Sequence, residues 1–324
     1  MKLLIPGGAG YVGSHMAKYA QNQGHDVVVM DDFSTGHEWA VRDYEVLRVN
    51  LLDQEMLARS LKGRQFDGVI HFAAKSLVSE SVKKPDLYYR NNVVGTLNLV
   101  HELLRNDIND LVFSSTAAIF GNPVTNSIAE EHSKLPINPY GQSKLMAENI
   151  LRDICSAYSF NATCLRYFNA AGADQSETIG EAHEPETHLI PNILKSVLPD
   201  GNKLKVFGTD YDTYDGTCVR DYVHVTDLAQ AHLLALEHMN NNSGFSAYNL
   251  GNGKGFSVAD VIKACEKVTG TCIQFAVEGR RAGDPAVLVA DSQLAFNQLG
   301  WRPEYDSLEA IVRSAWRWHQ RGSR

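Results

Sequence analysis

The chain has 324 residues, 44% of them hydrophobic, which is enough to build a core in each of two domains. Its formal net charge of -8, without a long run of Lys or Arg, argues against nucleic acid or an anionic membrane as a partner. No apolar stretch approaches the ~20 residues that a membrane-spanning helix needs. The five cysteines include no CxxC pair, so we expect no disulfide framework, no metal site and a cytoplasmic location.

Over the first part of the chain, short β-branched runs alternate with segments of helical periodicity. We expect strands at residues 2–6, 26–30, 45–49, 68–72 and 110–114. We expect helices at residues 11–22, 54–61, 89–105 and 140–157. This alternation predicts an α/β fold, with a Rossmann-like doubly wound parallel sheet at 1–167 and a smaller mixed α/β domain at 168–324. The boundary is approximate, the segments can interleave, and the cleft between the domains is the expected ligand site.

A glycine-rich turn, Gly7-Gly8-Ala9-Gly10-Tyr11-Val12-Gly13, joins the first predicted strand to the first predicted helix. Glycines there let the backbone turn tightly and let a pyrophosphate approach the helix N-terminus. Asp31 follows the second predicted strand, where a carboxylate accepts hydrogen bonds from ribose hydroxyls and repels a 2′-phosphate. The pattern predicts NAD as the cofactor. A plain surface loop, and a solvated turn at Asp31 and Asp32, are the competing interpretations.

Tyr140 and Lys144 stand four residues apart at the start of a predicted helix, so their side chains share one face. A lysine ammonium beside a phenol of reference pKa ~10 favours the phenolate, and the positive nicotinamide ring of NAD adds to this effect. The pair then serves as a general base near neutral pH. Thr116 follows a predicted strand, where its hydroxyl can bridge a substrate oxygen and the phenol. An ordinary helix surface and a strand-end cap are the competing interpretations.

Longer motifs extend these signals from Lys2 to about Trp318. They are His71-Phe72-Ala73-Ala74, Tyr89-Arg90-Asn91-Asn92-Val93, Ser114-Ser115-Thr116-Ala117-Ala118, Pro139-Tyr140-Gly141, Arg166-Tyr167-Phe168-Asn169, Val219-Arg220-Asp221-Tyr222 and Arg280-Arg281-Ala282-Gly283-Asp284. On these motifs the chain resembles the extended short-chain dehydrogenase/reductase family, and within it the sugar-nucleotide 4-epimerases. The resemblance assigns NAD to the first domain and a UDP-sugar to the second.

The resemblance also implies which residues contact each ligand. Around NAD it places Gly7, Gly10, Tyr11, Val12, Gly13, Asp31, Asn50, Leu51, Phe72, Ala73, Ala74, Asn92, Tyr140, Lys144 and Phe168. Around the UDP-sugar it places Thr116, Asn169, His188, Leu189, Val206, Phe207, Arg220, Arg281, Asp284 and Leu288. Guanidinium forks at Arg220 and Arg281 suit a diphosphate. A salt bridge with Asp221 or Asp284 is the competing interpretation.

Three positions depart from the family pattern. Pro6 stands where relatives usually have Thr, and it removes a backbone donor beside the glycine turn. Asn50 replaces an Asp that commonly faces the adenine amine, and its amide oxygen can still accept there. Ser76 falls where some members place a lysine near the cofactor, and we leave the neighbouring Lys75 outside the site.

By resemblance, the chain is expected to interconvert UDP-glucose and UDP-galactose through a transient 4-keto sugar, with NAD regenerated in each cycle. Tyr140 is expected to take the proton of the 4-hydroxyl. The alternative is a 4-epimerase of another UDP-sugar, such as a uronate, a pentose or an N-acetylhexosamine. A 4,6-dehydratase is disfavoured because Ala117 and Ala118 stand where that class has an acidic pair. A regulator that only senses NAD is disfavoured because the chain retains the Tyr/Lys pair. Relatives often pair through two helices of the first domain, so we expect a homodimer.

Leu288 bears on the choice of sugar. By resemblance, its side chain borders the hexose pocket, where a bulky aromatic residue crowds an N-acetyl group and a small residue leaves room for it. An ordinary core leucine between Val287 and Val289 is the competing interpretation, because apolar strand residues so often belong to the core.

Overall fold

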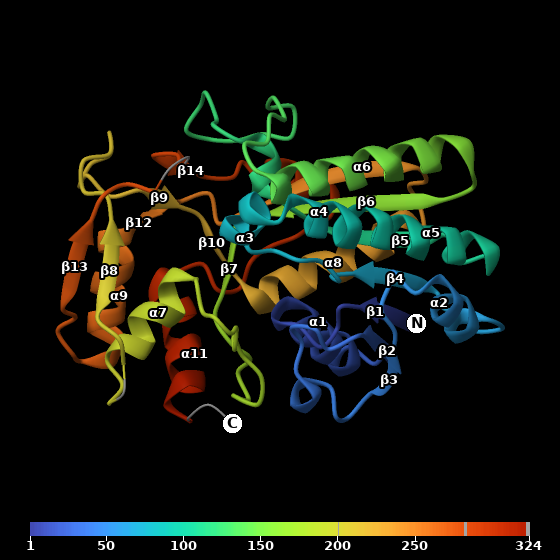
Figure 1. Cartoon of the computed structure of the whole chain (residues 1–324), viewed down its shortest axis with the longest axis horizontal. Coiled ribbons are helices and arrows are strands. Elements are labelled where there is room, and N and C mark those ends of the chain that lie inside the picture. Colours follow the sequence, from blue (N-terminus) through green and yellow to red (C-terminus); the bar gives the residue numbers. More distant parts are fainter. Residues whose placement is uncertain (200, 282–283, 322–324) are drawn as a thin grey trace.

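The structure is a computed structural model that describes residues 1–199, 201–281 and 284–321. Its larger part is a seven-stranded parallel sheet with helices on both faces (Figure 1). The strands are β1 (Lys2–Pro6), β2 (Asp26–Asp31), β3 (Glu45–Arg48), β4 (Gly68–His71), β5 (Asp110–Thr116), β6 (Asn161–Tyr167) and β11 (Phe245–Leu250). Their order is β11-β6-β5-β4-β1-β2-β3, so the succession of strands reverses between β1 and β4. Dinucleotides bind at the carboxyl edge of such a switch point.

Side chains alternate along the strands and build one core on each face of the sheet. The flanking helices are α1 (Tyr11–Asn22), α2 (Gln54–Leu61), α5 (Gly95–Arg105), α6 (Pro139–Ala157) and α8 (Val225–Met239). Leu3 and Ile5 of β1 pack with α1 and α8, whereas Leu4 packs with α2, α5 and α6. All three side chains are fully buried. Because both faces are covered, the central strands consist largely of apolar residues.

The elements expected in the first part of the chain are confirmed to within two residues at either end. The expected helix at 89–105 divides into a π-helical segment, η2 (Tyr89–Val94), and α5, and it follows the short helices α3 (Val78–Lys83) and α4 (Pro85–Tyr88). The sheet's last two strands, β6 and β11, and the helix α8 are not among the elements that we predicted from the sequence.

The remaining segments form a smaller mixed α/β part, at the left of Figure 1. Its strands are β7 (Asn169–Ala171), β8 (Leu204–Phe207), β9 (Val219–Arg220), β10 (Tyr222–His224), β12 (Phe256–Ser257), β13 (Phe275–Glu278) and β14 (Val287–Leu288). Its helices are α7 (Leu189–Ser196), α9 (Val258–Thr269) and α11 (Leu308–Gln320). The short helix α10 (Gln293–Gln298) packs against β11 instead, and its buried Ala295 belongs to the core of the larger sheet. Ile193, Val261 and Ile311 bring α7, α9 and α11 together in one buried cluster.

Three elements of the larger part, α8, β11 and α10, come from late in the chain. α8 packs against α1, and β11 pairs with β6 along its whole length, although both lie beyond residue 167. The chain therefore returns to the larger sheet after it has begun the smaller part. The domain boundary at residue 167 stays a prediction from the sequence.

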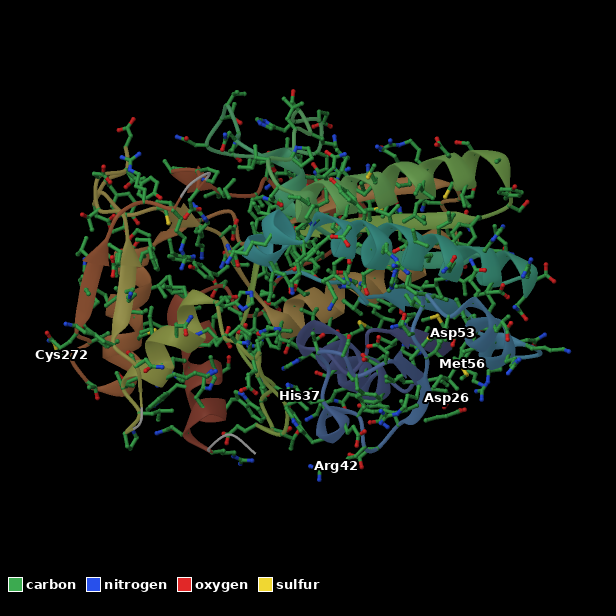
Figure 2. The ribbon with its side chains drawn as sticks, viewed as in Figure 1. Asp26, His37, Arg42, Asp53, Met56 and Cys272 are labelled. Carbon is green, nitrogen blue, oxygen red and sulfur yellow. The ribbon has the colours of Figure 1, made fainter. Side chains whose placement is uncertain are left out.

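Within the described residues, no helix is long and apolar enough to cross a membrane. All five cysteines are described and free. Cys272 is exposed in the turn between α9 and β13, at the outer edge of the smaller part (Figure 2).

A buried ion pair fastens α6 to the sheet. The Arg166 guanidinium of β6 donates from Nη2 to Glu148 Oε2 of α6 at 2.7 Å, and from Nε to Oε1 at 3.0 Å. The two side chains are only 2% and 0% exposed. Ser115 of β5 donates its hydroxyl to Glu148 Oε1 at 2.5 Å. One carboxylate thus joins α6 to two neighbouring strands at their carboxyl ends.

Replacing Glu148 with Gln is expected to lower the free energy of unfolding by about 3 to 5 kcal/mol, because the buried guanidinium loses its counter-charge. The measurement is urea denaturation followed by circular dichroism. The matched control is Glu55→Gln, which removes the i,i+4 ion-pair partner of Arg59. In that pair the side chains of Glu55 and Arg59 are 83% and 75% exposed. That control is expected to cost about 0.5 kcal/mol or less. Equal effects of the two substitutions would contradict the role assigned to Glu148.

Candidate active site

The glycine turn between β1 and α1 passes close to the end of β4. Gly7 has a φ of +80°, and a Cβ atom there would lie 2.3 Å from the backbone nitrogen of Ala73. A Cβ at Gly13 would lie 2.1 Å from the carbonyl oxygen of Gly7. Within the described residues, no side chain caps the N-terminus of α1, where Gly10 is the N-cap. The first N–H groups of α1 therefore remain available to an anion.

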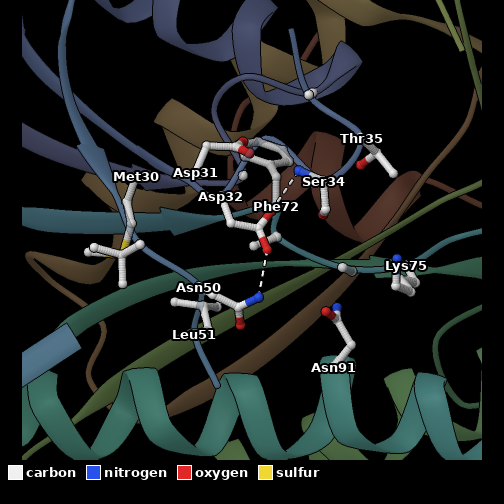
Figure 3. Close-up of a pocket in the computed structure, with 16 residues that line it drawn as sticks. Met30, Asp31, Asp32, Ser34, Thr35, Asn50, Leu51, Phe72, Lys75 and Asn91 are labelled. Atoms are coloured by element: carbon white, nitrogen blue, oxygen red, sulfur yellow. Dashed lines mark hydrogen bonds between the residues drawn. The ribbon is translucent and has the colours of Figure 1, made fainter. Parts of the chain in front are cut away.

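A pocket opens beside this turn, at the carboxyl ends of β1, β2 and β4 (Figure 3). It is lined by Gly7, Gly10, Met30, Asp31, Asp32, Ser34, Thr35, Gly36, Val49, Asn50, Leu51, Phe72, Ala73, Ala74, Lys75 and Asn91. The pocket brings together eight residues assigned to NAD from the sequence: Gly7, Gly10, Asp31, Asn50, Leu51, Phe72, Ala73 and Ala74. It adds a polar segment after β2, at residues 32–36, that sequence reasoning missed. The side chains of that segment follow no motif beyond the common turn residues Asp, Ser and Gly.

Asp31 is fixed at the end of β2 by two backbone donors. Its Oδ2 accepts from Ala9 N at 2.9 Å and its Oδ1 from Phe33 N at 2.8 Å. The residue is 9% exposed, and burial raises the pKa of its carboxyl, although the two N–H donors oppose that shift. Asp31 is therefore not part of a solvated turn. Its neighbour Asp32 accepts from Ser34 N at 2.8 Å, which is the hydrogen bond of an ordinary Asx turn.

Asn50 faces Asp32 across the pocket (Figure 3). Its Nδ2 donates to Asp32 Oδ2 at 2.7 Å, and its Oδ1 accepts from Leu52 N at 2.9 Å. The amide oxygen of Asn50, which we expect to accept a hydrogen bond from the adenine amine, therefore already accepts one hydrogen bond and has one lone pair left.

Asn92 holds the opposite wall in place. Its side chain forms a pair of hydrogen bonds with the backbone of Lys75, at 2.8 and 3.0 Å, and donates to Ser143 Oγ at 3.0 Å. The residue is 1% exposed, so its amide is a positioning group for the segment after β4. Lys75, which the sequence analysis leaves outside the site, lines the pocket together with Asn91.

Tyr11, Val12 and Gly13 form the first turn of α1 beside the pocket. The Tyr11 hydroxyl donates to the carbonyl oxygen of Gly172 at 2.7 Å, so the phenol links α1 to the segment that follows β7. Only backbone groups of this turn therefore remain for a pyrophosphate.

Thr116 and Tyr140 meet at the carboxyl edge of the sheet. Thr116 ends β5, and Tyr140 lies in the first turn of α6, where the N-cap Asn138 accepts from Gly141 N at 2.9 Å. Burial raises the pKa of the Tyr140 phenol, while a hydrogen bond with Thr116 lowers it again in part. The expected proximity of hydroxyl and phenol is thus present in the structure.

Lys144 follows Tyr140 by one turn, but its ammonium group is directed to the strand. Nζ donates to the carbonyl oxygen of Ser114 at 2.7 Å and lies 4.6 Å from the centre of the Phe113 ring. Burial lowers the pKa of this lysine to about 7. In the protein alone, the Tyr140 pKa is therefore raised and not lowered, contrary to the direction that we expected from the Tyr/Lys spacing. The lowering that catalysis needs then depends on the positive charge that a bound nicotinamide brings.

Two of the residues assigned to the UDP-sugar are arginines. Arg220 forms an ion pair with Asp284 and donates to the carbonyl oxygen of Pro285 at 2.8 Å, with its side chain 12% exposed. The salt bridge weighed as the competing interpretation is therefore present. The Arg281 Cζ atom lies 4.1 Å from the centre of the Phe207 ring, which is a cation–π contact. Residues 282 and 283 of this motif lie outside the described residues.

Other expected substrate residues have structural partners. Asn169 donates its side-chain amide to the carbonyl oxygen of Asp221 at 2.8 Å, and Val206 is 2% exposed within the core of the smaller part. His188 is the N-cap residue of α7, which begins at Leu189. Phe168 and Leu288 pack against the cluster that contains Ala117, directly after Thr116.

The chain was compared with protein families and with known proteins. The model of the NAD dependent epimerase/dehydratase family matches residues 3–251. The UDP-glucose 4-epimerase of Halalkalibacterium halodurans is 48% identical over 320 residues, which cover 99% of this chain and 96% of that protein. The crystal structure of UDP-glucose 4-epimerase from Brucella ovis in complex with NAD is 45% identical, with a TM-score of 0.94 and 97% of each chain covered.

A second solved structure has UDP in addition to the dinucleotide. It is the UDP-glucose 4-epimerase from Bifidobacterium longum in complex with NAD+ and UDP, which is 36% identical with a TM-score of 0.94 and 99% of each chain covered. These likenesses extend over the whole chain, and the family model includes the glycine turn, Thr116, Tyr140 and Lys144. The chain therefore belongs to the NAD dependent epimerase/dehydratase family.

Proposed function

We propose that this protein interconverts UDP-galactose and UDP-glucose, with NAD as its cofactor. The observation that carries the proposal is the packing of the first turns of α6, with Tyr140 and Lys144, against the end of β5 at the sheet edge that also holds the dinucleotide pocket. Lys144 Nζ donates to the Ser114 carbonyl oxygen at 2.7 Å, and a Cβ at Gly141 would lie 2.4 Å from the carbonyl oxygen of Ala118. Full-length similarity to proteins named UDP-glucose 4-epimerase supports the choice of sugar nucleotide.

The residues present fit NAD. The glycine turn leaves a cradle that a Cβ at Gly7 would fill, the N-terminus of α1 is free to face a pyrophosphate, and Asp31 stands where ribose hydroxyls would donate. When bound, NAD takes up a hydride from C4 of the sugar and gives it back to that carbon. Asp31 carries a negative charge when ionised and disfavours a 2′-phosphate, so the pocket selects NAD over NADP.

The chain's own groups handle the proton. Tyr140 accepts the proton of the 4-hydroxyl as the alcohol becomes a ketone, and it returns that proton when the alcohol forms again. Thr116 holds the oxygen that loses and regains the proton. Lys144, anchored on Ser114, adds positive charge beside the phenol whenever the lysine is protonated. Epimerisation requires the 4-keto sugar to present its other face before it is reduced.

The UDP-sugar is assigned to the smaller part of the chain. Arg281 and Arg220 supply local cations in a protein whose net charge is -8. Arg220 would have to share its guanidinium between Asp284 and a phosphate, which its five N–H donors permit. Asn169, Leu189 and Phe207 are the other groups proposed to border the nucleotide. His188 is proposed to do so only through its backbone, because its imidazole contacts Glu181 and Glu186.

A homodimer in the cytoplasm belongs to the same proposal. Val94 in η2, Leu97 in α5 and Met146 in α6 are large apolar side chains exposed by 40 to 43%. These helices lie on one face of the larger part in Figure 1 and supply apolar area for pairing. Light scattering of the purified chain measures the assembly.

The proposed function is tested by incubating the full chain with separate UDP-sugars and separating the C4 epimers. UDP-galactose is expected to give UDP-glucose, and the reverse. Turnover of a UDP-uronate or UDP-pentose without turnover of UDP-galactose would overturn the proposed substrate and leave the 4-epimerase chemistry in place.

The freshly purified chain is expected to contain NAD and to need no added cofactor, because each cycle returns its own hydride. Denaturation followed by chromatography measures the released dinucleotide. An active preparation that contains neither NAD nor NADH would contradict the recycling mechanism.

Tyr140→Phe is expected to lower kcat by about 100- to 10,000-fold, the usual cost of a lost general base, and to leave UDP affinity nearly unchanged. Steady-state kinetics and calorimetric titration with UDP measure the two quantities. Near-normal turnover in this variant would remove Tyr140 from the role of base.

Leu288 is expected to set the preference between UDP-galactose and UDP-N-acetylgalactosamine. It lies in β14 opposite Arg220 and packs beside the cluster that follows Thr116, which supports a position at the sugar. A clash of one or two heavy atoms corresponds to about 10- to 200-fold discrimination. Leu288→Ala should lower the ratio of kcat/KM for UDP-galactose to kcat/KM for UDP-N-acetylgalactosamine, and Leu288→Tyr should raise that ratio. A constant ratio in folded variants would show that Leu288 is an ordinary core residue.

A further inference from the structure

The segment that leads into α7 carries two glutamates and two histidines that converge on one point: Glu181, His183, Glu186 and His188. One ligand atom from each side chain lies within 4.8 Å of the corresponding atoms of the other three. We propose that these four side chains form a binding site for a divalent transition-metal ion of the zinc class. From the absence of a CxxC pair we expected no metal site.

The spacing of the four atoms suits a tetrahedral ion. His188 Nδ1 lies 2.7 Å from Glu181 Oε1 and 3.1 Å from Glu186 Oε1. His183 Nδ1 lies 3.1 Å from Glu181 Oε1 and 4.0 Å from Glu186 Oε1. Zinc binds nitrogen and oxygen ligands at about 2.0 to 2.1 Å, so neighbouring ligands in a tetrahedron stand about 3.3 Å apart. These four of the six distances between ligand atoms bracket that value, and the other two are no longer than 4.8 Å.

The two carboxylates of the cluster are buried, whereas the side chains of His183 and His188 are 29% and 44% exposed. The side chains of Glu181 and Glu186 are 4% and 6% exposed. Glu186 Oε2 is buried and accepts no hydrogen bond from the described residues, and its contact there is an ion pair with Lys195, whose Nζ lies 3.6 Å away. One lysine beside two buried carboxylates leaves them short of positive charge, which a metal ion would supply.

The ligand types restrict the ion. Calcium and magnesium prefer sites made of oxygen ligands, whereas imidazole nitrogen together with carboxylate oxygen suits zinc and its first-row neighbours. All four positions of a tetrahedron are supplied by the protein, which is typical of a structural site and not of a catalytic one.

The backbone around the cluster connects the two parts of the chain. The carbonyl oxygen of Glu181 accepts from Trp318 Nε1 of α11 at 3.0 Å, and that of Ala182 accepts from His37 Nε2 at 2.7 Å. The Tyr11 ring of α1 stands edge-on to the His183 ring, with centroids 6.0 Å apart. An ion bound by these four side chains would therefore stiffen residues 181–188. This segment contacts both α1 and α11 and leads into α7, which begins at Leu189.

Charged hydrogen bonds are the rival explanation of the same contacts. Burial alone would lower the pKa of His188, but Glu181 and Glu186 raise it to about 10, so a protonated imidazole can also satisfy the carboxylates. The two explanations differ in one measurable respect, because only a metal site takes up an ion with fixed stoichiometry.

The test uses the full chain, stripped with a chelator and then titrated with Zn²⁺ against a chromophoric competitor. We expect one tightly bound equivalent per chain. Glu181→Gln and His183→Gln should each weaken binding by more than the about 10- to 100-fold that loss of an outer-shell partner costs. The matched control is Glu184→Gln, in the same segment but with an exposed side chain outside the cluster, and it should leave affinity unchanged.

Substitution with Co²⁺ identifies the ligands. Nitrogen and oxygen ligands should give tetrahedral d–d bands without thiolate charge transfer, because the four side chains include no cysteine. If the unaltered chain binds Zn²⁺ no more tightly than the folded variants Glu181→Gln or His183→Gln, the proposed site is wrong. A thiolate band, or an equal loss of affinity in Glu184→Gln, would overturn it as well.

Discussion

The carbonyl oxygen of Pro6 accepts hydrogen bonds from two successive backbone donors, Phe72 N at 2.7 Å and Ala73 N at 2.9 Å. These bonds hold the glycine turn against the end of β4, at the point where the strand order reverses. The contact is so close that Gly7 admits no side chain. Because Pro6 also pairs with Met30 in the β1–β2 register, Asp31 comes to the same edge one residue later. The cofactor pocket is thus a consequence of how three strands end together.

The proposed catalytic groups depend on a second contact of the same kind, between the end of β5 and one face of α6. Ser114 accepts from Lys144 through its carbonyl oxygen, Ser115 donates to Glu148, and Thr116 interacts with Tyr140. The three helical residues are spaced by four, so they form one stripe along α6. Three consecutive strand residues therefore align the whole stripe. The buried Glu148–Arg166 pair fixes how far α6 can slide along β5.

Local sequence patterns were sufficient for much of this arrangement. The strands β1 to β5, the helices α1, α2, α5 and α6, the glycine turn and the position of Asp31 follow from β-branched runs, helical periodicity and turn residues within short windows. The short helices α3 and α4 were not predicted. The direction of the Lys144 side chain could not be predicted in this way. It depends on a competing acceptor, the Ser114 carbonyl oxygen, and on burial that also reverses the expected shift of the Tyr140 pKa.

Contacts between distant segments account for the other differences. Arg220 pairs with Asp284 and not with adjacent Asp221, because the Asp221 carboxylate already accepts from three backbone N–H groups, of Asn252, Gly253 and Ala290, at 2.7 to 3.1 Å. Lys75 reaches the pocket because Asn92 binds its backbone. Neither interaction leaves a trace in the residues that flank the charged group.

The late return of the chain to the larger sheet affects how the protein folds as it is synthesised. Until residues 245–250 have left the ribosome, β6 is the edge of the sheet, and its backbone N–H and C=O groups on that side have no partner strand. An edge of this kind, next to a core that still lacks α8, is a template for pairing with other nascent chains. More than eighty residues separate Ala162 from its partner Phe245, so the ribosome must add all of them while that edge is open. The placement of β11 thus makes the last strand of the nucleotide-binding sheet also its protection against aggregation.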